Sequence, residues 1–290
     1  MIIGIDLGGT KIAGVLCTPS GKVLTDVHIP TEASQGKKHV IANIKKAISH
    51  LANGQRVKIQ AIGIGAPGPI IYDEGIVVEA PNLPGWKRVN LKKILQKEFK
   101  FPVFVDNDAN CAALAEARFG AGKSVRHFLY LTISTGIGGG IIIDKKLYRG
   151  AIGAAGEIGH MTIDYQGQQC SCGRLGCLEA LASGTALKRK TGLDALSLEL
   201  AACQGDKKAQ KAITELAHYL AIGIGNLVNI FNPQLIVIGG GLSNMRGLLF
   251  DPLKKEFKRY ALTLPAQSVK IVRAKLGTQA GPLGAAALCL

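Results

Sequence analysis

Short apolar runs that end in glycine are the first feature of this sequence. The opening run, residues 2–7, is continuous enough for a buried strand and stops at Gly8-Gly9. Two more runs follow at residues 12–16 and 22–28, joined by the turn residues Pro19-Ser20-Gly21. The pattern therefore predicts that the chain begins with an antiparallel meander of three strands.

Helical spacing and further strand signals then alternate to the end of the chain. The sequence predicts helices over residues 40–51, 91–99, 108–119, 207–231 and 281–290, the fourth of which is stopped by Asn232-Pro233. It predicts strands over residues 57–65, 103–105, 128–134, 139–143, 235–238 and 269–272. Alternating strands and helices indicate the α/β class, and the order of the first half recurs from about residue 128.

Composition narrows the class of protein. With 290 residues, 47% of them hydrophobic, the chain can bury the cores of two domains. The opening residues carry no basic segment, and the longest apolar runs are short, so we expect a cytoplasmic protein without a membrane partner. The net charge of +15 suits nucleic acid or an anionic nucleotide, but the lysines are spread over helix-like stretches. A solvated basic surface is the simpler interpretation, and we predict no nucleic-acid partner.

Three glycine runs at strand ends are the first candidate binding elements. The first is Asp6-Leu7-Gly8-Gly9-Thr10-Lys11, and the second is Thr132-Ile133-Ser134-Thr135-Gly136-Ile137-Gly138-Gly139-Gly140. Glycine lets backbone N–H groups approach a phosphate closely, and a carboxylate such as Asp6 suits hydrated Mg²⁺. The third run, Gly239-Gly240-Gly241, suits the approach of a flat adenosine. A plain glycine hairpin is the alternative interpretation of the first run.

The segment Asp106-Asn107-Asp108-Ala109-Asn110 joins a predicted strand to an Ala-rich helix. A carboxylate at such a position can accept the proton of an attacking hydroxyl, and Asn107 can both donate to and accept from hydroxyls. Asp108 is equally suited to be the N-cap of the helix, and the residues alone leave both roles open.

Cysteines and a histidine form the fourth motif. Cys170, Cys172 and Cys177 lie within eight residues, and His160 precedes them. This set fits a closed tetrahedral zinc site, with buried unligated thiols as the alternative. Such a metal loop would also fix Glu157 and Glu179, two carboxylates that could accept hydrogen bonds from a polyol.

These motifs together resemble the ROK family of bacterial sugar kinases, most closely its glucokinase-type members, over the whole chain. The resemblance rests on the first two glycine runs, on Pro81-Asn82-Leu83-Pro84-Gly85-Trp86, and on Asn107-Asp108-Ala109-Asn110. It rests further on Glu157-Ile158-Gly159-His160 and on the pattern Cys170-x-Cys172-Gly173-x-x-Gly176-Cys177-x-Glu179, which is the most specific of the set.

The resemblance implies an actin/hexokinase-like (ribonuclease H-like) fold with two α/β domains around a cleft. We expect a smaller domain over residues 1–109, with a C-terminal helix at 277–290 packing back on it. A larger domain is expected over residues 110–276, with a zinc-binding insertion at about 150–184. The resemblance also implies a homodimer.

The resemblance also assigns roles to individual residues. Asp108 would be the general base toward the 6-hydroxyl of a hexose, and the other sugar hydroxyls would be bound by Asn82, Asn107, Glu157, His160 and Glu179. ATP and Mg²⁺ would be bound around Asp6, Gly8, Gly9, Thr10, Lys11, Thr135, Gly136, Gly138 and Gly240. A structural Zn²⁺ would be held by His160, Cys170, Cys172 and Cys177.

Glucose, as the entry substrate of glycolysis, is the substrate we predict. N-acetylmannosamine, N-acetylglucosamine, fructose and mannose stay open, as does polyphosphate in place of ATP. A sugar-responsive transcription repressor or another sugar-sensing regulator is the non-enzyme alternative. Repressors of this family carry a helix-turn-helix ahead of the first glycine run, whereas here Asp6 is the sixth residue, so we expect a kinase.

Overall fold

Two five-stranded sheets form the framework of the protein. The computed structural model describes residues 1–53, 59–80 and 82–290. The first sheet has the strand order β3-β2-β1-β4-β8, and its bounds are β1 Ile2–Leu7, β2 Lys11–Cys17, β3 Val23–Pro30, β4 Ala61–Ala66 and β8 Val103–Asn107. β4 is buried along its whole length, whereas the edge strand β3 alternates between half-buried and exposed positions. Continuous apolar runs therefore became central strands, as expected for strands that are covered on both faces.

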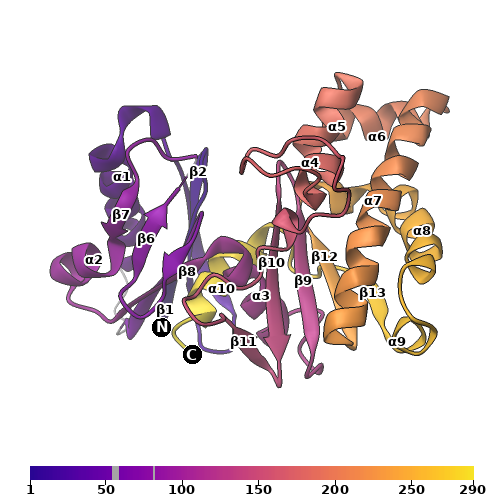
Figure 1. The fold of residues 1–290 in the computed structure, drawn as a ribbon. Coiled ribbons are helices and arrows are strands. Elements are labelled where there is room, and N and C mark those ends of the chain that lie inside the picture. Colours follow the sequence, from indigo (N-terminus) through magenta and orange to yellow (C-terminus); the bar gives the residue numbers. More distant parts are fainter. Residues whose placement is uncertain (54–58, 81) are drawn as a thin grey trace.

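The second sheet repeats the order of the first. Its strands follow the order β11-β10-β9-β12-β13, with bounds β9 Phe128–Ile133, β10 Ile137–Ile143, β11 Lys146–Tyr148, β12 Leu235–Gly239 and β13 Lys270–Arg273. In each sheet, the first three strands in sequence pair antiparallel to one another, and the other two run parallel to the first of them. The two sheets lie side by side in Figure 1, the first at the left and the second at the right.

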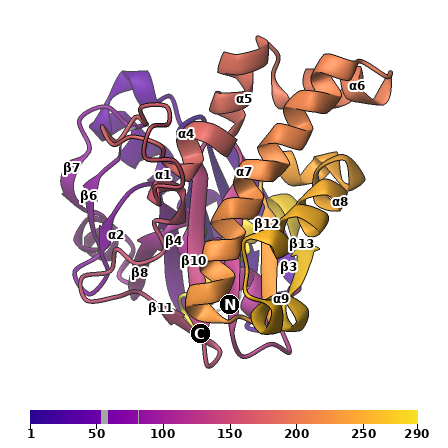
Figure 2. The ribbon, with the colours of Figure 1, turned by 45° about the vertical axis from the view of Figure 1, so that its right-hand side comes forward.

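Helices cover the outer parts of both halves. The first half carries α1 Lys37–Ala52 and α2 Leu91–Phe99. The second half carries α4 Leu178–Ala182, α5 Gly184–Thr191, α6 Ala195–Cys203, α7 Lys207–Phe231, α8 Gly247–Glu256 and α9 Thr263–Ser268. Figure 2 shows α7 running along the second sheet, with α8 beside it. Among the described residues, no helix combines the length and apolarity that crossing a bilayer requires.

Two helices, α3 Asp108–Arg118 and α10 Ala280–Ala287, lie between the sheets (Figure 1). α10 packs on α3 and also on β1 and β4 of the first sheet. Its approach to β4 is so close that a Cβ at Gly63 would lie 1.7 Å from the carbonyl oxygen of Ala285. Gly284 allows an equally close contact with α3, because a Cβ there would lie 1.8 Å from the Cys111 oxygen. These contacts fix the backbone of α10 against both neighbours.

A buried carboxylate links the end of α3 to the segment that precedes α10, the two helices that lie between the sheets. Glu116 of α3 is fully buried, and its Oε1 accepts hydrogen bonds from the N–H groups of Lys275 and Leu276, both at 2.9 Å. Its Oε2 accepts from the Ala121 N–H at 2.6 Å. The end of α3 is thereby tied to the segment that leads from β13 into α10. Three N–H donors satisfy a side chain that would be costly to bury without partners.

The structure confirms the predicted α/β class and most of the predicted elements. The bounds of α2 and α7 agree with the prediction, whereas β10 begins two residues before the predicted residue 139, and α10 ends before the predicted residue 290. The predicted strand 57–65 is described from residue 59, and its β-structure begins at Ala61. Residues 57 and 58, and Pro81 of the third family motif, lie outside the described residues.

A small third sheet was not predicted. It consists of β5 Ile70–Ile71, β6 Ile76–Glu79 and β7 Lys87–Asn90 in antiparallel order. These strands have at most four residues and lie among prolines and glycines, so no window long enough to display alternation contains them.

Candidate active site

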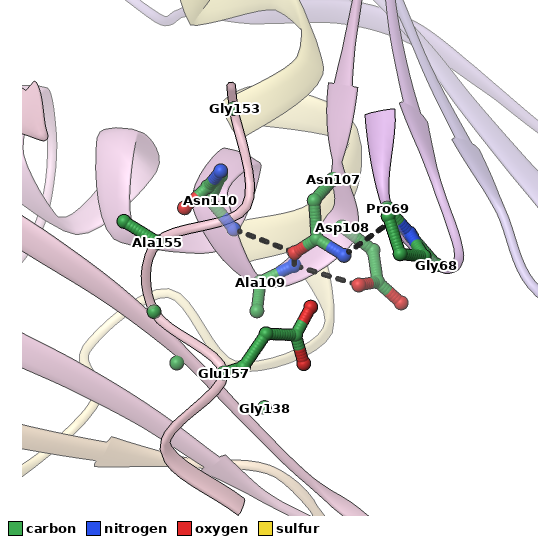
Figure 3. Close-up of a pocket in the computed structure, with 12 residues that line it drawn as sticks. Gly68, Pro69, Asn107, Asp108, Ala109, Asn110, Gly138, Gly153, Ala155 and Glu157 are labelled. Atoms are coloured by element: carbon green, nitrogen blue, oxygen red, sulfur yellow. Dashed lines mark hydrogen bonds between the residues drawn. The ribbon is translucent and has the colours of Figure 1, made fainter. Parts of the chain in front are cut away.

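A pocket lies where β8, α3 and the segment before His160 meet. Its lining includes Gly68 and Pro69 after β4, Asn107 and Asp108 at the junction of β8 with α3, and Glu157. Figure 3 shows the carboxylates of Asp108 and Glu157, which come from different segments of the chain, pointing into the same space. The carboxyl end of a parallel strand and the N-terminus of a helix thus supply one wall, and residues after β11 supply the other.

Asp108 is the first residue of α3, and its carboxylate is reachable by solvent through the pocket. Surrounding protein atoms nevertheless remove much of the water from around the carboxylate, and this desolvation raises the pKa of Asp108 from 3.8 to about 6. The Ala109 N–H, which donates to Asp108 Oδ1 at 2.8 Å, opposes this rise, whereas the negative charge of Glu157 adds to it. A carboxylate with a pKa near neutrality is suited to accept a proton from a hydroxyl.

Asn107, rather than Asp108, is the N-cap of α3. Its Oδ1 accepts from the N–H groups of Ala109 at 2.9 Å and Asn110 at 3.2 Å, and its Nδ2 donates to the Gly68 oxygen at 3.2 Å. The N-cap alternative for Asp108 is therefore wrong, because the cap must precede the first helical residue. The capping bonds leave the Asp108 carboxylate free to face the pocket.

The first glycine run forms the turn between β1 and β2. The Gly8 N–H donates to the Lys11 oxygen at 3.0 Å, and the buried Thr31 hydroxyl donates to the Gly8 oxygen at 2.7 Å. Asp6 lies at the end of β1, where burial raises its pKa to about 7, with a smaller rise from the Asp108 charge and an opposing effect of Lys11. Asp6 and Asp108 are thus brought into one electrostatic site.

Asn82 and Gly240 are distant in sequence from the first two glycine runs but lie close to them in space. Asn82 lies beside the first run, and Gly240 lies beside the second. A Cβ at Gly9 would lie 3.0 Å from Asn82 Cβ, so Asn82 is beside the first turn. Gly240 has a φ of 82°, and a Cβ there would lie 2.3 Å from the oxygen of Ile133, at the end of β9. Glycine is therefore required at position 240 both for its conformation and for its packing.

The second glycine run forms the turn between β9 and β10, and residues from other segments hold this turn by hydrogen bonds. Glu179 Oε2 accepts from the Ile137 N–H at 2.8 Å, and a Cβ at Gly136 would lie 2.3 Å from the same oxygen. The Thr135 oxygen accepts from the Thr185 hydroxyl at 2.8 Å. Gly138 packs against the Ala109 Cβ at the start of α3. The turn is thereby fixed relative to both Glu179 and Asp108.

The predicted zinc ligands gather in one place. One ligand atom from each of His160, Cys170, Cys172 and Cys177 lies within 4.8 Å of all the others. Cys172 and Cys177 Sγ are 3.7 Å apart, and Cys170 Sγ is 3.7 Å from His160 Nδ1. Ligands about 2.3 Å from a tetrahedral zinc would be about 3.8 Å apart, so the four residues fit this metal. Because Nδ1 faces the cysteines, Nε2 is the ring nitrogen left for a second partner.

Several pocket residues were not predicted. Gly68, Pro69, Asn110, Gly153 and Ala155 line the pocket, although none was assigned a role from the sequence. The run Ala66-Pro67-Gly68-Pro69 directly after a buried strand was a usable signal for the first two, because chain turns at strand ends build such sites. Gly153 and Ala155 lie in a loop without local pattern, and their position depends on tertiary contacts.

The fold and the pocket define a protein of two related α/β halves that meet at an acidic site. Residues 2–290 match the model of the ROK family, and the chain belongs to this family. Among its relatives, the glucokinase of Halalkalibacterium halodurans is 38% identical over 97% of this chain and 92% of its own length. A putative xylose repressor of Caldicellulosiruptor sp. is 37% identical over 100% of this chain and 78% of its own length.

Solved structures agree with this assignment. The ROK hexokinase of Thermus thermophilus is 38% identical, with a TM-score of 0.89 over 99% of this chain and 97% of that one. The ROK glucokinase of Streptomyces griseus, solved in complex with glucose and AMPPNP, is 34% identical, with a TM-score of 0.86 over 99% and 98% of the two chains.

The raised pKa of Asp108 predicts an acidic limb in the activity of the protein. If Asp108 must be unprotonated to act as a base, kcat/KM falls as the pH drops through about 6, whereas an ordinary Asp would give a fall near 4. Coupling to Asp6, whose pKa is about 7, broadens the limb toward 7. Steady-state assays from pH 5 to 9 measure it. Glu157→Gln should move the limb to lower pH, and a wild-type profile that stays flat down to pH 5 would contradict this assignment.

Proposed function

We propose that this protein is an ATP-dependent hexose kinase that transfers the γ-phosphoryl group to the 6-hydroxyl of glucose. The observation that carries the proposal is the position of Asp108, which faces a pocket flanked by the braced glycine turn of β9 and β10. The similarity to glucokinases over nearly the full length of both chains supports glucose as the acceptor.

Asp108 would take the proton of the attacking sugar hydroxyl. The hydroxyl oxygen then bonds to the γ-phosphorus of ATP, and the bond between that phosphorus and the ADP oxygen breaks. Its raised pKa favours this proton transfer near neutral pH. The remaining sugar hydroxyls would be held by Glu157, by His160 through Nε2, and by Glu179, Asn82 and Asn107. Since these polar groups are left unpaired by a sugar that lacks the matching hydroxyls, they would also discriminate between sugars.

The nucleotide would lie along the glycine turns. Backbone N–H groups at Gly9 and Thr10, in the turn that Gly8 opens, and at Thr135, Gly136 and Gly138, are suited to phosphate oxygens, with Lys11 as a nearby cation and Gly240 toward the adenosine. Asp6 would hold the hydrated Mg²⁺, which supplies charge compensation at the phosphates. Its position at the end of β1, close enough to Asp108 for the two charges to interact, suits this role.

Zinc would serve a structural role. Held by His160, Cys170, Cys172 and Cys177, it would fix the loop between His160 and Glu179, and with it two of the proposed sugar ligands. We further propose that residues 1–109 with the C-terminal helix and residues 110–276 act as two domains that close on the substrates, and that the protein is a cytoplasmic homodimer.

The sugar preference is tested by an assay of ADP release with Mg²⁺ and ATP. Glucose, mannose, fructose, N-acetylglucosamine and N-acetylmannosamine are compared by kcat/KM, and we expect glucose to be used best. Preference for an acetylated sugar would reassign the substrate while leaving the base in place. The absence of turnover with all five would refute the kinase and favour a sugar-sensing regulator, an alternative supported by the relative named a putative xylose repressor.

The zinc site is tested by metal analysis. Protein purified without added metal should contain about one zinc per chain. Cys172→Ser should lose it and bind sugar more weakly, because the loop carrying His160 and Glu179 is released. Cys203→Ser is the matched control, since Cys203 is exposed and outside the set, and it should keep both zinc and affinity. Metal-free wild-type protein with full activity would contradict the site.

A further inference from the structure

An ion pair that the sequence did not reveal connects the two walls of the pocket. Arg149 follows β11 in the second half of the chain, and its Nε donates to Oδ2 of Asp106 in β8 at 2.8 Å. Asp106 is only 1% exposed, and the Arg149 side chain is 25% exposed. The two residues are separated by 43 positions in the sequence, so the bond joins segments that no local pattern relates.

Asp106 has a second set of partners at the base of the site. Its Oδ1 accepts from the Asn107 N–H at 2.7 Å and from Asn110 Nδ2 at 3.0 Å. One carboxylate therefore holds both the start of α3, which carries Asp108, and the guanidinium of Arg149. Without Arg149 the negative charge would remain buried with neutral partners only, which is unfavourable.

The guanidinium also stacks on an aromatic ring of the first half. Arg149 Cζ lies 3.7 Å from the centroid of the Tyr72 ring, just after β5. A planar guanidinium can stack and donate at the same time, whereas the ammonium of lysine offers a point charge. Arg149 thus makes two different contacts across the pocket, both to residues of the first half.

Arg149 begins the segment 149–157, which ends at Glu157. The Ala155 N–H donates to the Arg149 oxygen at 3.0 Å and closes this segment into a loop. A Cβ at Gly153 would lie 2.6 Å from the oxygen of Ile70 in β5, so the loop also rests on the first half. Gly153 and Glu157 both line the pocket. The position of this wall therefore depends on how the loop is attached.

We propose that Arg149 is a positioning residue for sugar binding. Through Asp106 and Tyr72 it holds the loop 149–157, and with it Glu157, against the strand end that carries Asn107 and Asp108. This inference rests on the proposed kinase function and assigns one wall of its sugar site. Without Arg149, the start of α3 keeps its Asn107 cap and the second glycine turn keeps its hydrogen bonds to Glu179 and Thr185, so we expect loss of Arg149 to weaken sugar binding more than it slows phosphoryl transfer.

The test compares Arg149→Met, Arg149→Lys and the control Arg126→Met. Arg126 also pairs with an aspartate, Asp144, but this pair is exposed and neither residue lines the pocket. In Arg149→Met we expect the KM for glucose to rise at least about tenfold, since loss of one well-placed hydrogen bond to a charged group typically weakens binding by about tenfold or more. The KM for ATP and kcat should stay within about threefold, Arg149→Lys should be intermediate, and Arg126→Met should match the wild type.

The double variant Asp106→Asn/Arg149→Met separates anchoring from charge neutralisation. If Arg149 anchors the loop, the double variant keeps the high KM of Arg149→Met. A return to the wild-type KM would overturn the proposal, because it would mean that Arg149 only compensates the Asp106 charge. A fall in kcat with unchanged KM in Arg149→Met would also overturn it, because that pattern indicates a lost transition-state interaction or a smaller fraction of active enzyme, and not weaker sugar binding.

Hydrogen exchange gives a readout without substrate. The Ala155 amide should exchange faster in Arg149→Met than in the wild type, and equal rates would contradict the anchoring role. The failures of the two proposals are distinguishable. Wild-type protein without turnover of any sugar refutes the kinase, whereas an active wild type with an unchanged KM in Arg149→Met refutes only the role of Arg149.

Discussion

The gathering of carboxylates at one place is the constraint on which the rest of this structure depends. Asp6 lies one residue before the end of β1, Asp106 and Asp108 lie on either side of the junction of β8 with α3, and Glu157 approaches from the other half. Burial raises the pKa values of Asp6 and Asp108, and repulsion by the neighbouring negative charges adds a smaller rise. The surrounding chain has to supply compensation for each of them.

Each carboxylate is compensated in a different way, and the difference suggests its role. Asp106 is buried and accepts hydrogen bonds from Arg149, Asn110 and a backbone N–H, so its carboxylate is not open to a substrate. Asp108 accepts the Ala109 N–H and otherwise faces the pocket, so it is free to receive a proton. Asp6 has Lys11 nearby and is suited to a hydrated cation. In the proposed function, the same residue type would thus serve as support, base and metal partner according to its contacts.

The two helices between the sheets hold the Asp6 and Asp108 carboxylates in fixed relative positions. α3 carries Asp108 at its first residue, and α10 packs against both α3 and β1, the strand that carries Asp6. A Cβ at Gly281 of α10 would lie 2.2 Å from Asp6 Oδ2, so the helix touches the carboxylate itself. Glu116 ties the far end of α3 to the segment entering α10. A displacement of either helix would therefore move both acids.

Much of this arrangement was predictable because its signals are local. The Asn232-Pro233 stop set the end of α7, the glycine runs marked the turns, and the Cys170 to Cys177 spacing predicted a cluster that the structure brings together. What could not be predicted depends on distant pairs, such as Arg149 with Asp106, or on very short strands, such as β5. The choice of Asn107 over Asp108 as the cap of α3 also required the structure, since both residue types favour that position.

The most direct test of the account measures glucose binding and phosphoryl transfer separately in Asp108→Asn. Calorimetry should give a glucose Kd within about threefold of the wild type, while turnover falls at least about a hundredfold, the usual contribution of a general base. Asp26→Asn, at an exposed carboxylate of β3, is the control and should retain full activity. Asp108→Asn protein that still turns over glucose at the wild-type rate would contradict the assignment of Asp108 as the base, and with it the central claim about this site.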